Sequence, residues 1–192
     1  MAANAPVAVV TGANRGIGRE VCGQLAIRGY AVALGSRDLT KGQEASAGLG
    51  DTANITACEL DVADDASVRA VSEWVAEQFG RCDALVNNAA IHYDTWQRAE
   101  NADLAIVREA IETNLLGAWR TVLAFLPLLK ASPHGRIVNV SSEGGSLTGM
   151  GAGAPAYHVT KAGLNAMTRT LASELRGAGV LVNAVCPGWT AT

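Results

Sequence analysis

The stretch that most constrains the fold of this chain runs from Val7 to Gly18. Four apolar residues, Val7 to Val10, end at Thr11, and three glycines follow with the spacing G-x-x-x-G-x-G before a helical pattern begins. A strand, a tight turn and a helix N-terminus in this order can bind a diphosphate, because glycines let backbone N–H groups approach the phosphates and the helix dipole favours negative charge. An ordinary glycine-rich surface turn is the alternative interpretation.

Strand-like and helix-like segments alternate along the rest of the chain. The expected strands are 7–10, 31–34, 54–60, 83–87, 136–141 and 180–185, and the expected helices are 16–28, 39–49, 66–79, 103–130 and 156–176. This alternation predicts an α/β fold: one domain over residues 1–192, built as a three-layer, doubly wound parallel sheet of the Rossmann type. Ligands of such sheets bind at the carboxyl ends of the strands. The polar or turn residues expected at those ends are Thr11, Ser36, Asp61, Asn87, Ser141, Ser142 and Pro187.

Composition excludes several classes of function. The net charge is −3 and the chain has no basic run, so nucleic acid and anionic membranes are poor candidate partners. A chain of 192 residues can bury roughly 70% of its unfolded surface and needs no disulfides. The scattered cysteines are expected to be small core residues in a reducing compartment, with no metal site: Cys22, Cys58, Cys82 and Cys186. No apolar run approaches 18 residues, and we expect a cytoplasmic protein.

A second candidate for chemistry is the pair Tyr157 and Lys161. Residues four apart share one face of a helix. An ammonium about 5 Å from a phenol, at an effective dielectric near 20, contributes roughly 3 kcal/mol in favour of the phenolate. Such a tyrosine can exchange a proton with an oxygen whose carbon gains or loses hydride. A buried tyrosine beside an exposed lysine is the alternative interpretation of the same spacing.

The motifs taken together resemble the short-chain dehydrogenase/reductase family over nearly the whole chain. Thr11 to Gly18 matches T-G-x-x-x-G-x-G, and Asn87 to Ala90 resembles N-N-A-G. Further matches are N-x-x-G at Asn114 and Gly117, the strand-five signature at Asn139–Ser142, Y-x-x-x-K at Tyr157 and Lys161, and P-G at Pro187–Gly188. Within the family, the chain most resembles the carbonyl-reductase-like branch.

The resemblance implies a catalytic role for four residues. Tyr157 would be the general acid and base, and Lys161 would ease the loss of its proton and bind the nicotinamide ribose. Ser142 would hydrogen-bond the substrate carbonyl oxygen, with Ser141 as its rival, and Asn114 would hold a water that links Lys161 to solvent.

The end of the second strand bears on the choice between NAD and NADP. The resemblance places an acidic residue of NAD-dependent members where this chain has Ser36. Arg37 and Arg15 can bind a 2′-phosphate, whereas Asp38 could bind a free ribose or simply cap the next helix. We expect NADP (NADPH), with NAD the less favoured cofactor. The predicted cofactor-binding residues are Gly12, Asn14, Arg15, Gly16, Ile17, Gly18, Ser36, Arg37, Asp61, Val62, Asn88, Ala89, Tyr157, Lys161, Pro187, Gly188, Thr190 and Thr192.

The sequence also departs from the family pattern. Ala90 replaces a glycine, and the chain ends at Thr192, where the family continues into a further helix and a last strand. We therefore expect a fold without those elements, with strand 180–185 at an edge that a missing tail or a partner covers. Loop residues His92, Tyr93 and Trp96 suit a hydrophobic aldehyde or ketone.

The predicted function is an NADPH-dependent oxidoreductase that transfers hydride between the nicotinamide and a small-molecule carbonyl or secondary alcohol. The alternatives are a 3-oxoacyl-carrier-protein reductase or sugar-type dehydrogenase, and a non-catalytic NADP-binding regulatory protein. Both a monomer and a homo-oligomer are compatible with the sequence.

Overall fold

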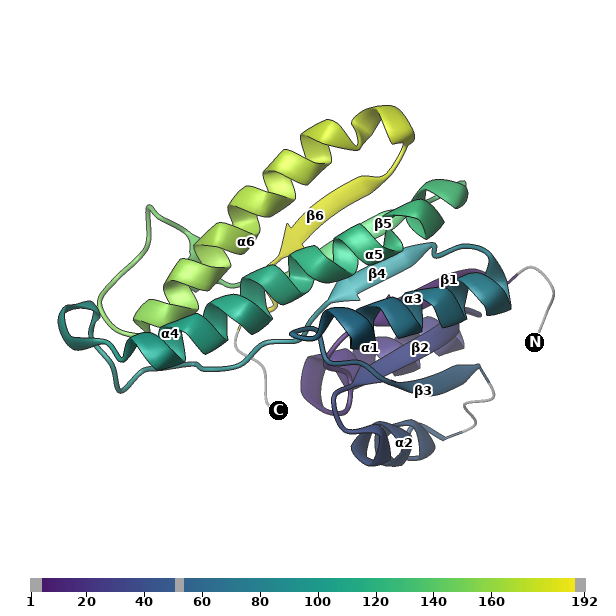
Figure 1. Cartoon of the computed structure of the whole chain (residues 1–192), viewed down its shortest axis with the longest axis horizontal. Helices are drawn as coiled ribbons and strands as arrows, with labels where there is room; N and C mark the ends of the chain where they lie inside the picture. Colours follow the sequence, from purple (N-terminus) through teal and green to yellow (C-terminus); the bar gives the residue numbers. More distant parts are fainter. Residues whose placement is uncertain (1–4, 51–53, 189–192) are drawn as a thin grey trace.

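The computed structural model describes residues 5–50 and 54–188, whose strands form one six-stranded sheet (Figure 1). The strand order is β3-β2-β1-β4-β5-β6, and every neighbouring pair is parallel. The order reverses between β1 and β4, where ligands of such folds bind. The predicted doubly wound parallel sheet is thus confirmed. The strands are β1 (Val7–Val10), β2 (Ala31–Ser36), β3 (Ile55–Glu59), β4 (Ala84–Asn87), β5 (Arg136–Val140) and β6 (Leu181–Val185).

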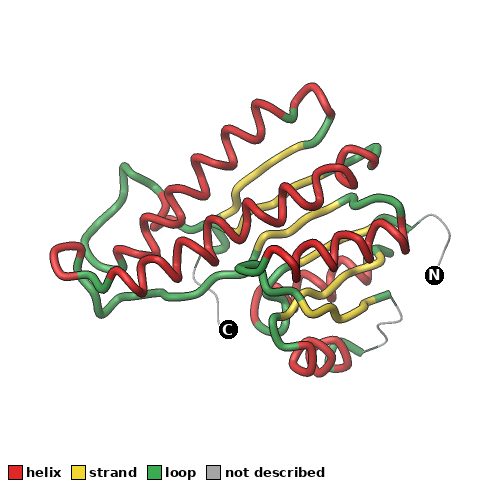
Figure 2. Tube along the Cα trace, viewed as in Figure 1, coloured by secondary structure: helices red, strands yellow, loops and turns green. Residues whose placement is uncertain are grey.

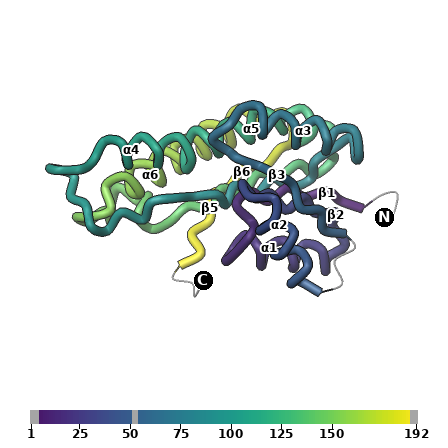
Figure 3. Tube along the Cα trace, turned by 60° about the horizontal axis from the view of Figure 1, so that its bottom comes forward, coloured from purple at the N-terminus to yellow at the C-terminus, as the bar shows by residue number. Residues whose placement is uncertain are grey.

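Helices cover both faces of the sheet (Figure 3). The helices α1 and α2 lie on one face, and α3 to α6 lie on the other. Each face has its own hydrophobic core, and β1 contributes to both because alternate side chains of a strand point to opposite faces. The helices are α1 (Gly16–Ile27), α2 (Leu39–Ala47), α3 (Asp65–Phe79), α4 (Leu104–Ala110), α5 (Ala118–Ala131) and α6 (Pro155–Glu174).

Burial explains why these segments are held in place. All four residues of β1 are buried, as expected for a central parallel strand covered on both faces. From α5, Phe125 and Leu129 are fully buried against the same core as Ile137 of β5. Each such side chain contributes roughly 1.5–3 kcal/mol through removal of its apolar surface from water.

The expected helix from 103 to 130 is interrupted, which corrects the sequence-based prediction. Residues Ile111–Gly117 form a π-helical segment between α4 and α5. Figure 2 shows it as part of one long helical path. At Gly117 a Cβ atom would lie 2.7 Å from Cγ2 of Val62, so the helix approaches the loop after β3 more closely than another residue would allow. Apolar periodicity does not register a π-segment, since the helix faces on either side still read as helical.

Several boundaries also differ from the predictions by one to three residues. The strand β2 extends to Ser36, and β5 stops at Val140, so Ser141 follows the strand instead of ending it. Short 3₁₀ segments occupy Ala99–Asn101, Glu143–Gly145 and Arg176–Ala178. Such differences arise because helix and strand ends depend on local hydrogen bonds rather than on periodicity.

The cysteine prediction is right in part. Burial raises the pKa of the Cys22 and Cys82 thiols to about 12, which makes them inert core groups. Cys58 is half-buried, whereas Cys186 is exposed, so its assignment to the core is wrong. Among the described residues, no cluster of histidine, cysteine and carboxylate side chains could hold a metal ion. No helix in the described part of the chain is long and apolar enough to cross a membrane.

Candidate active site

The glycine turn after β1 packs directly against the segment that follows β4. Gly12 and Gly16 have φ values of +60° and +53°, which favour glycine. A Cβ atom at Gly12 would lie 2.7 Å from Cα of Ala89. Arg15, the residue that precedes α1, gives no side-chain cap to the helix. Within residues 5–50 and 54–188, no side chain caps the first N–H groups of α1, and this fits an external phosphate.

A groove of about 720 Å³ opens beside this turn. It is formed at the carboxyl ends of β1 to β4, where the strand order reverses. The residues that line it and were predicted to bind a cofactor are Gly12, Asn14, Arg15, Gly16, Ile17, Ser36, Arg37, Asp61, Val62, Asn88 and Ala89. The lining residues without such a prediction are Asp38, Lys41, Leu60, Ala90, Ile91 and Thr113. The volume lies within the range of cofactor sites in general.

Of the other predicted cofactor residues that the structure describes, none lines the groove: Gly18, Tyr157, Lys161, Pro187 and Gly188. Gly18 lies beneath the turn, where a Cβ atom would come within 2.5 Å of Nδ2 of Asn88. Pro187 and Gly188 are exposed beyond β6, and Gly188 has a φ of +70°. Thr190 and Thr192 lie outside the described residues.

The groove beside the end of β2 is lined by three basic side chains, Arg15, Arg37 and Lys41, and by two acidic ones, Asp38 and Asp61. The hydroxyl of Ser36 is buried and donates to the backbone carbonyl of Asp38 at 2.7 Å. Asp38 accepts the backbone N–H of Lys41 at 3.1 Å and pairs with the Lys41 ammonium at 3.5 Å, and that backbone bond holds the pKa of the carboxyl below its usual value. The helix-capping interpretation of Asp38 is confirmed. The side chains of Arg15 and Arg37 are exposed at the groove.

Tyr157 and Lys161 lie one turn apart on α6. The Lys161 ammonium is 5.5 Å from the centroid of the Tyr157 ring and donates to the carbonyl of Val140 at 2.7 Å. Only 3% of Lys161 is exposed, and burial lowers its pKa to about 8. The alternative of a lysine exposed to solvent is therefore wrong.

The two candidate serines have different surroundings. Ser141 is buried, and its hydroxyl has no hydrogen-bond partner within residues 5–50 and 54–188. Ser142 is half-buried and accepts the backbone N–H of Gly144 at 3.2 Å. A Cβ atom at Gly144 would lie 2.7 Å from Cδ2 of His158 and 3.6 Å from Cδ1 of Tyr157. The segment that contains Ser142 thus lies against the first turn of α6.

Asn114 connects the site to the π-helical segment. Its amide nitrogen donates to the carbonyl of Ile91 at 2.9 Å and to the hydroxyl of Thr160 at 3.2 Å, and its amide oxygen accepts the N–H of Ile91 at 2.8 Å. Both amide protons are therefore engaged by protein atoms. A water molecule at this point would have to donate to an oxygen of Asn114.

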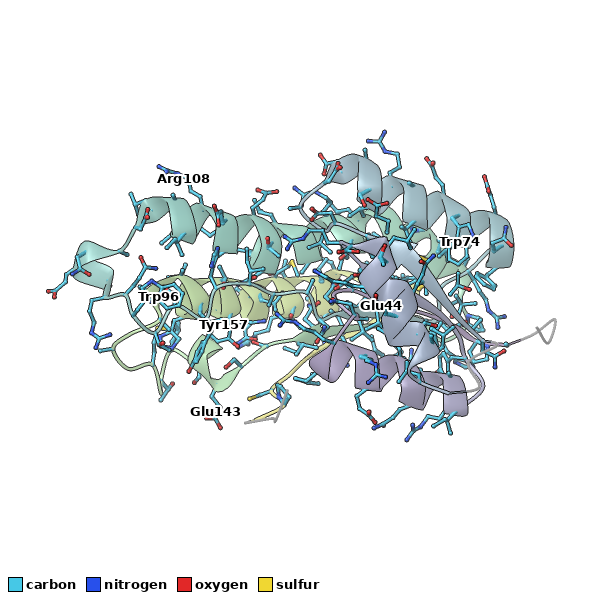
Figure 4. All side chains as sticks on the ribbon, turned by 90° about the horizontal axis from the view of Figure 1, so that it is seen from below. Glu44, Trp74, Trp96, Arg108, Glu143 and Tyr157 are labelled. Atoms are coloured by element: carbon cyan, nitrogen blue, oxygen red, sulfur yellow. The ribbon has the colours of Figure 1, made fainter. Side chains whose placement is uncertain are left out.

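Aromatic side chains of the loop after β4 lie beside the tyrosine. The rings of Tyr93 and Tyr157 meet edge to face, with centroids 5.0 Å apart. Trp96 is exposed, and Figure 4 shows it in the same half of the molecule as Tyr157, away from Trp74. Nε2 of His92 lies 2.7 Å from a carboxylate oxygen of Glu109, within hydrogen-bond distance.

Besides the uncharged lining residues given above, two charged residues of the site were missed from the sequence. Lys41 lies one helical turn after Asp38, and a helix starting at Leu39 could have indicated that its side chain returns to the groove. Asp94 is fully buried and bonds the start of α6. The sequence offered one clue to this role: neither Gly153 nor Ala154, just before α6, can cap a helix with its side chain. The cap must therefore come from elsewhere in the chain.

Comparison with known proteins agrees with this geometry. The family model described as short chain dehydrogenase matches residues 6–192. A (+)-neomenthol dehydrogenase of Arabidopsis thaliana is 36% identical over 250 residues, which cover 96% of this chain and 83% of that protein. A Pseudomonas aeruginosa RhlG/NADP complex is 29% identical with a TM-score of 0.88, and a Brucella melitensis 3-ketoacyl-(acyl-carrier-protein) reductase complexed with NADH is 28% identical with a TM-score of 0.86. Each structure match covers 97% of this chain, and 73% and 76% of those chains respectively. This chain belongs to the short-chain dehydrogenase/reductase family and is an oxidoreductase of carbonyl and alcohol groups that uses a nicotinamide cofactor.

Proposed function

We propose that the protein is an NADPH-dependent reductase of ketones or aldehydes, similar to the carbonyl-reductase-like branch of its family. The observation that carries the proposal is the buried Lys161 ammonium beside the Tyr157 ring on α6. Asn114 links this helix to the groove, because it bonds both Thr160 of α6 and the lining residue Ile91. A protein that only bound the cofactor could use Lys161 at the ribose, but it would not need the Tyr157 phenol beside that ammonium as a proton donor.

Four residues would divide the chemistry. When bound, NADPH supplies the hydride. Tyr157 donates the proton to the carbonyl oxygen, and the hydroxyl of Ser142 donates a hydrogen bond to the same oxygen as negative charge develops on it. The Lys161 ammonium stabilises the tyrosinate that remains. Water held at an oxygen of Asn114 then returns the proton from solvent through Lys161.

The preference for NADPH rests on the charges around the end of β2. Arg15, Arg37 and Lys41 supply three cations at the groove, and the carboxylate of Asp38 is engaged by the start of α2. The free 2′-hydroxyl of NAD is best bound by an acidic acceptor, and this chain has Ser36 at that position. The Ser36 hydroxyl already donates its proton to the backbone carbonyl of Asp38. A 2′-phosphate would meet two guanidinium groups that match its geometry.

The aromatic residues of the loop after β4 support a substrate with an apolar face next to its carbonyl group. Tyr93 is half exposed beside Tyr157 and is available for such a contact. The neomenthol dehydrogenase match is compatible with this class of substrate. The matched 3-ketoacyl-(acyl-carrier-protein) reductase supports a 3-oxoacyl thioester as the alternative substrate. Activity with a panel of cyclic ketones, aldehydes and 3-oxoacyl thioesters distinguishes the two.

The catalytic part of the proposal is tested with Tyr157→Phe. We expect carbonyl-dependent oxidation of NADPH to fall by roughly 10²–10⁴-fold, since the proton donor is lost. NADPH affinity should stay within twofold. The control is Tyr30→Phe, which removes the same hydroxyl from a tyrosine before β2. Retention of turnover by Tyr157→Phe would contradict the assignment, and cofactor binding without turnover in the unchanged protein would favour a regulatory role.

The cofactor part is tested with Arg37→Ala. NADPH affinity should fall tenfold or more, whereas NADH affinity should hold or rise, because only the phosphate loses a partner. Arg28→Ala is the matched control, since the Arg28 guanidinium is exposed at the far end of α1 and bonds the carbonyl of Gln24. An unchanged NADPH affinity in Arg37→Ala would make the assignment wrong.

A further inference from the structure

The carboxylate of Asp94 is fully buried although it belongs to a loop. This residue follows β4 by seven positions and is 0% exposed. One carboxylate oxygen accepts the backbone N–H of Tyr157 at 3.0 Å, and the other accepts the N–H of Ala156 at 3.0 Å. The side chain of Gln97 donates to the second oxygen at 2.9 Å. Both carboxylate oxygens therefore accept hydrogen bonds from protein donors, and two of these donors belong to the first turn of α6.

The helix α6 has no cap of its own. Ala154, the residue that precedes it, makes no side-chain bond and has φ +44° and ψ +50°. A residue with a Cβ atom is strained in this left-handed conformation and keeps it only when surrounding contacts enforce it. Asp94 supplies the missing acceptors from 62 and 63 residues earlier in the chain. Its negative charge also complements the positive end of the helix dipole.

The same loop is anchored at two further points. The backbone of Ile91 is bonded on both sides by the amide of Asn114, and the side-chain oxygen of Gln97 accepts the N–H of Asp103 at 2.7 Å. Between the anchors at Ile91 and Asp94 lies Tyr93, whose ring meets that of Tyr157 edge to face. The backbone of Tyr93 is thus fixed relative to the tyrosine that we assign to proton transfer.

We propose that Asp94 is a positioning residue that holds Tyr157 and the Tyr93 ring as one unit. It acts through the first turn of α6 and touches no reacting atom. Loss of its carboxylate frees the turn that carries Tyr157 and the loop that carries Tyr93 at the same time. The phenol would then spend less time at the carbonyl oxygen, and a misplacement of about 1 Å is enough to cost 10²-fold in rate. The groove that binds the cofactor does not include Asp94, so cofactor affinity is spared. The kinetic consequence rests on the proposed function.

The test compares Asp94→Ala and Asp94→Asn with Asp64→Ala. Asp64 caps α3 in the same way, through the N–H of Ala66 at 2.8 Å, and stands apart from α6. We expect Asp94→Ala to lower kcat tenfold or more, while the KM for NADPH stays within twofold. Asp94→Asn keeps one acceptor oxygen and should recover part of the rate. Asp64→Ala should keep the kcat of the unchanged protein and lower only the melting temperature.

Two readouts do not depend on turnover. In Asp94→Ala bound to NADPH, the backbone amides of Ala156 and Tyr157 should exchange hydrogen faster, and the NMR contact between the Tyr93 and Tyr157 rings should disappear. Neither change should occur in Asp64→Ala. If the unchanged protein reduces no carbonyl compound, the proposed function fails while these two signals still report on the unit formed by Asp94.

The proposal is wrong if Asp94→Ala folds and keeps its kcat within twofold, or if the ring contact survives. It is equally wrong if kcat and NADPH affinity fall in parallel, since this pattern indicates general loss of structure. Where Asp94→Ala does not fold, Asp94→Asn and Gln97→Leu decide. Gln97→Leu removes one donor to the carboxylate and the acceptor of the Asp103 N–H. It leaves the bonds of Asp94 to Ala156 and Tyr157 in place, so it should lower kcat less than Asp94→Asn. The opposite order overturns the proposal.

Discussion

At the scale of single residues, Lys161 has the most consequential environment. Its ammonium is buried, donates to a backbone carbonyl and faces the Tyr157 ring, and no carboxylate bonds to it within the described residues. Burial disfavours the charged form and lowers its pKa to about 8. The charge on which the tyrosinate depends is therefore lost just above neutral pH.

This gives a prediction for pH dependence. The lysine is charged below pH 8 and neutral above it, so kcat/KM for NADPH, which reports the free enzyme, should be level below about pH 8 and fall above it by up to tenfold per pH unit. Lys161→Arg keeps its charge throughout this range. That variant should be slower but should lack the decline near pH 8. A decline in both proteins would assign the ionisation to another group.

The same pKa has a consequence for stability. Between pH 8 and about 10.5 the unfolded chain binds more protons at this residue than the folded chain, so the residue's contribution to the free energy of unfolding rises with pH in that window. Below pH 8 the full cost of burying the ammonium is present. The cost identifies Lys161 as a residue kept for function and not for stability.

At the scale of elements, the glycine turn is defined by what it packs against. Asn88 donates from Nδ2 to the carbonyls of Thr11 at 3.0 Å and Gly12 at 2.9 Å, and this amide lies where a side chain of Gly18 would be. The turn, the start of α1 and the segment after β4 therefore fit together only while Gly18 has no Cβ atom.

Gly18→Ala tests this packing. The new Cβ atom would lie 2.5 Å from Nδ2 of Asn88 and 2.9 Å from the Gly12 carbonyl oxygen, so it must displace the amide that holds the turn. We expect NADPH affinity to fall tenfold or more in binding titrations, together with a lower melting temperature. Gly23→Ala on the same helix would meet only the flexible side chain of Leu49, at 3.1 Å or more, and should leave affinity unchanged. Equal affinities in the two variants would refute the argument.

How much the sequence could predict differs between elements. The parallel sheet and the glycine turn followed from apolar periodicity and glycine spacing, because both are local properties of the chain. The π-helical segment at 111–117 did not, since apolar periodicity does not distinguish it from an α-helix. The packing of Gly117 at its end against Val62 involves a loop that is distant in the sequence. The role of Asp94 was also hidden, because its partners at Ala156 and Tyr157 are more than 60 positions away. Pairings of this kind are set by tertiary structure.

At the scale of the whole molecule, the two ends of the sheet have separate tasks. The groove lies at the carboxyl ends of the strands. The end of β5 also contacts the site of Tyr157, because the Val140 carbonyl accepts a hydrogen bond from Lys161. At the amino ends, buried Asp83 accepts the N–H of Val7 at 2.7 Å, the Arg81 guanidinium at 3.1 Å and the Ser132 hydroxyl at 2.5 Å. It joins β1, β4 and the end of α5 on the side away from the groove.

Asp83→Ala should therefore change stability without changing catalysis. Its removal leaves the buried N–H of Val7 without its acceptor and takes one acceptor from Arg81 and one from Ser132, so the free energy of unfolding should fall by about 2–4 kcal/mol. Urea unfolding measures that loss. Below the melting temperature, kcat should match that of the unchanged protein. A large fall in kcat at full folding would mean that the two ends are coupled.

The division between the two ends has a practical consequence. In Figure 1 the chain enters β1 from the side opposite to the strand ends that carry the glycine turn. Coupling the protein to a solid support through residues ahead of β1 would orient every molecule with its groove toward the bulk liquid. An immobilised catalyst made in this way should keep free exchange of cofactor and product, whereas attachment through surface lysines at random would block Lys41 in a fraction of the molecules.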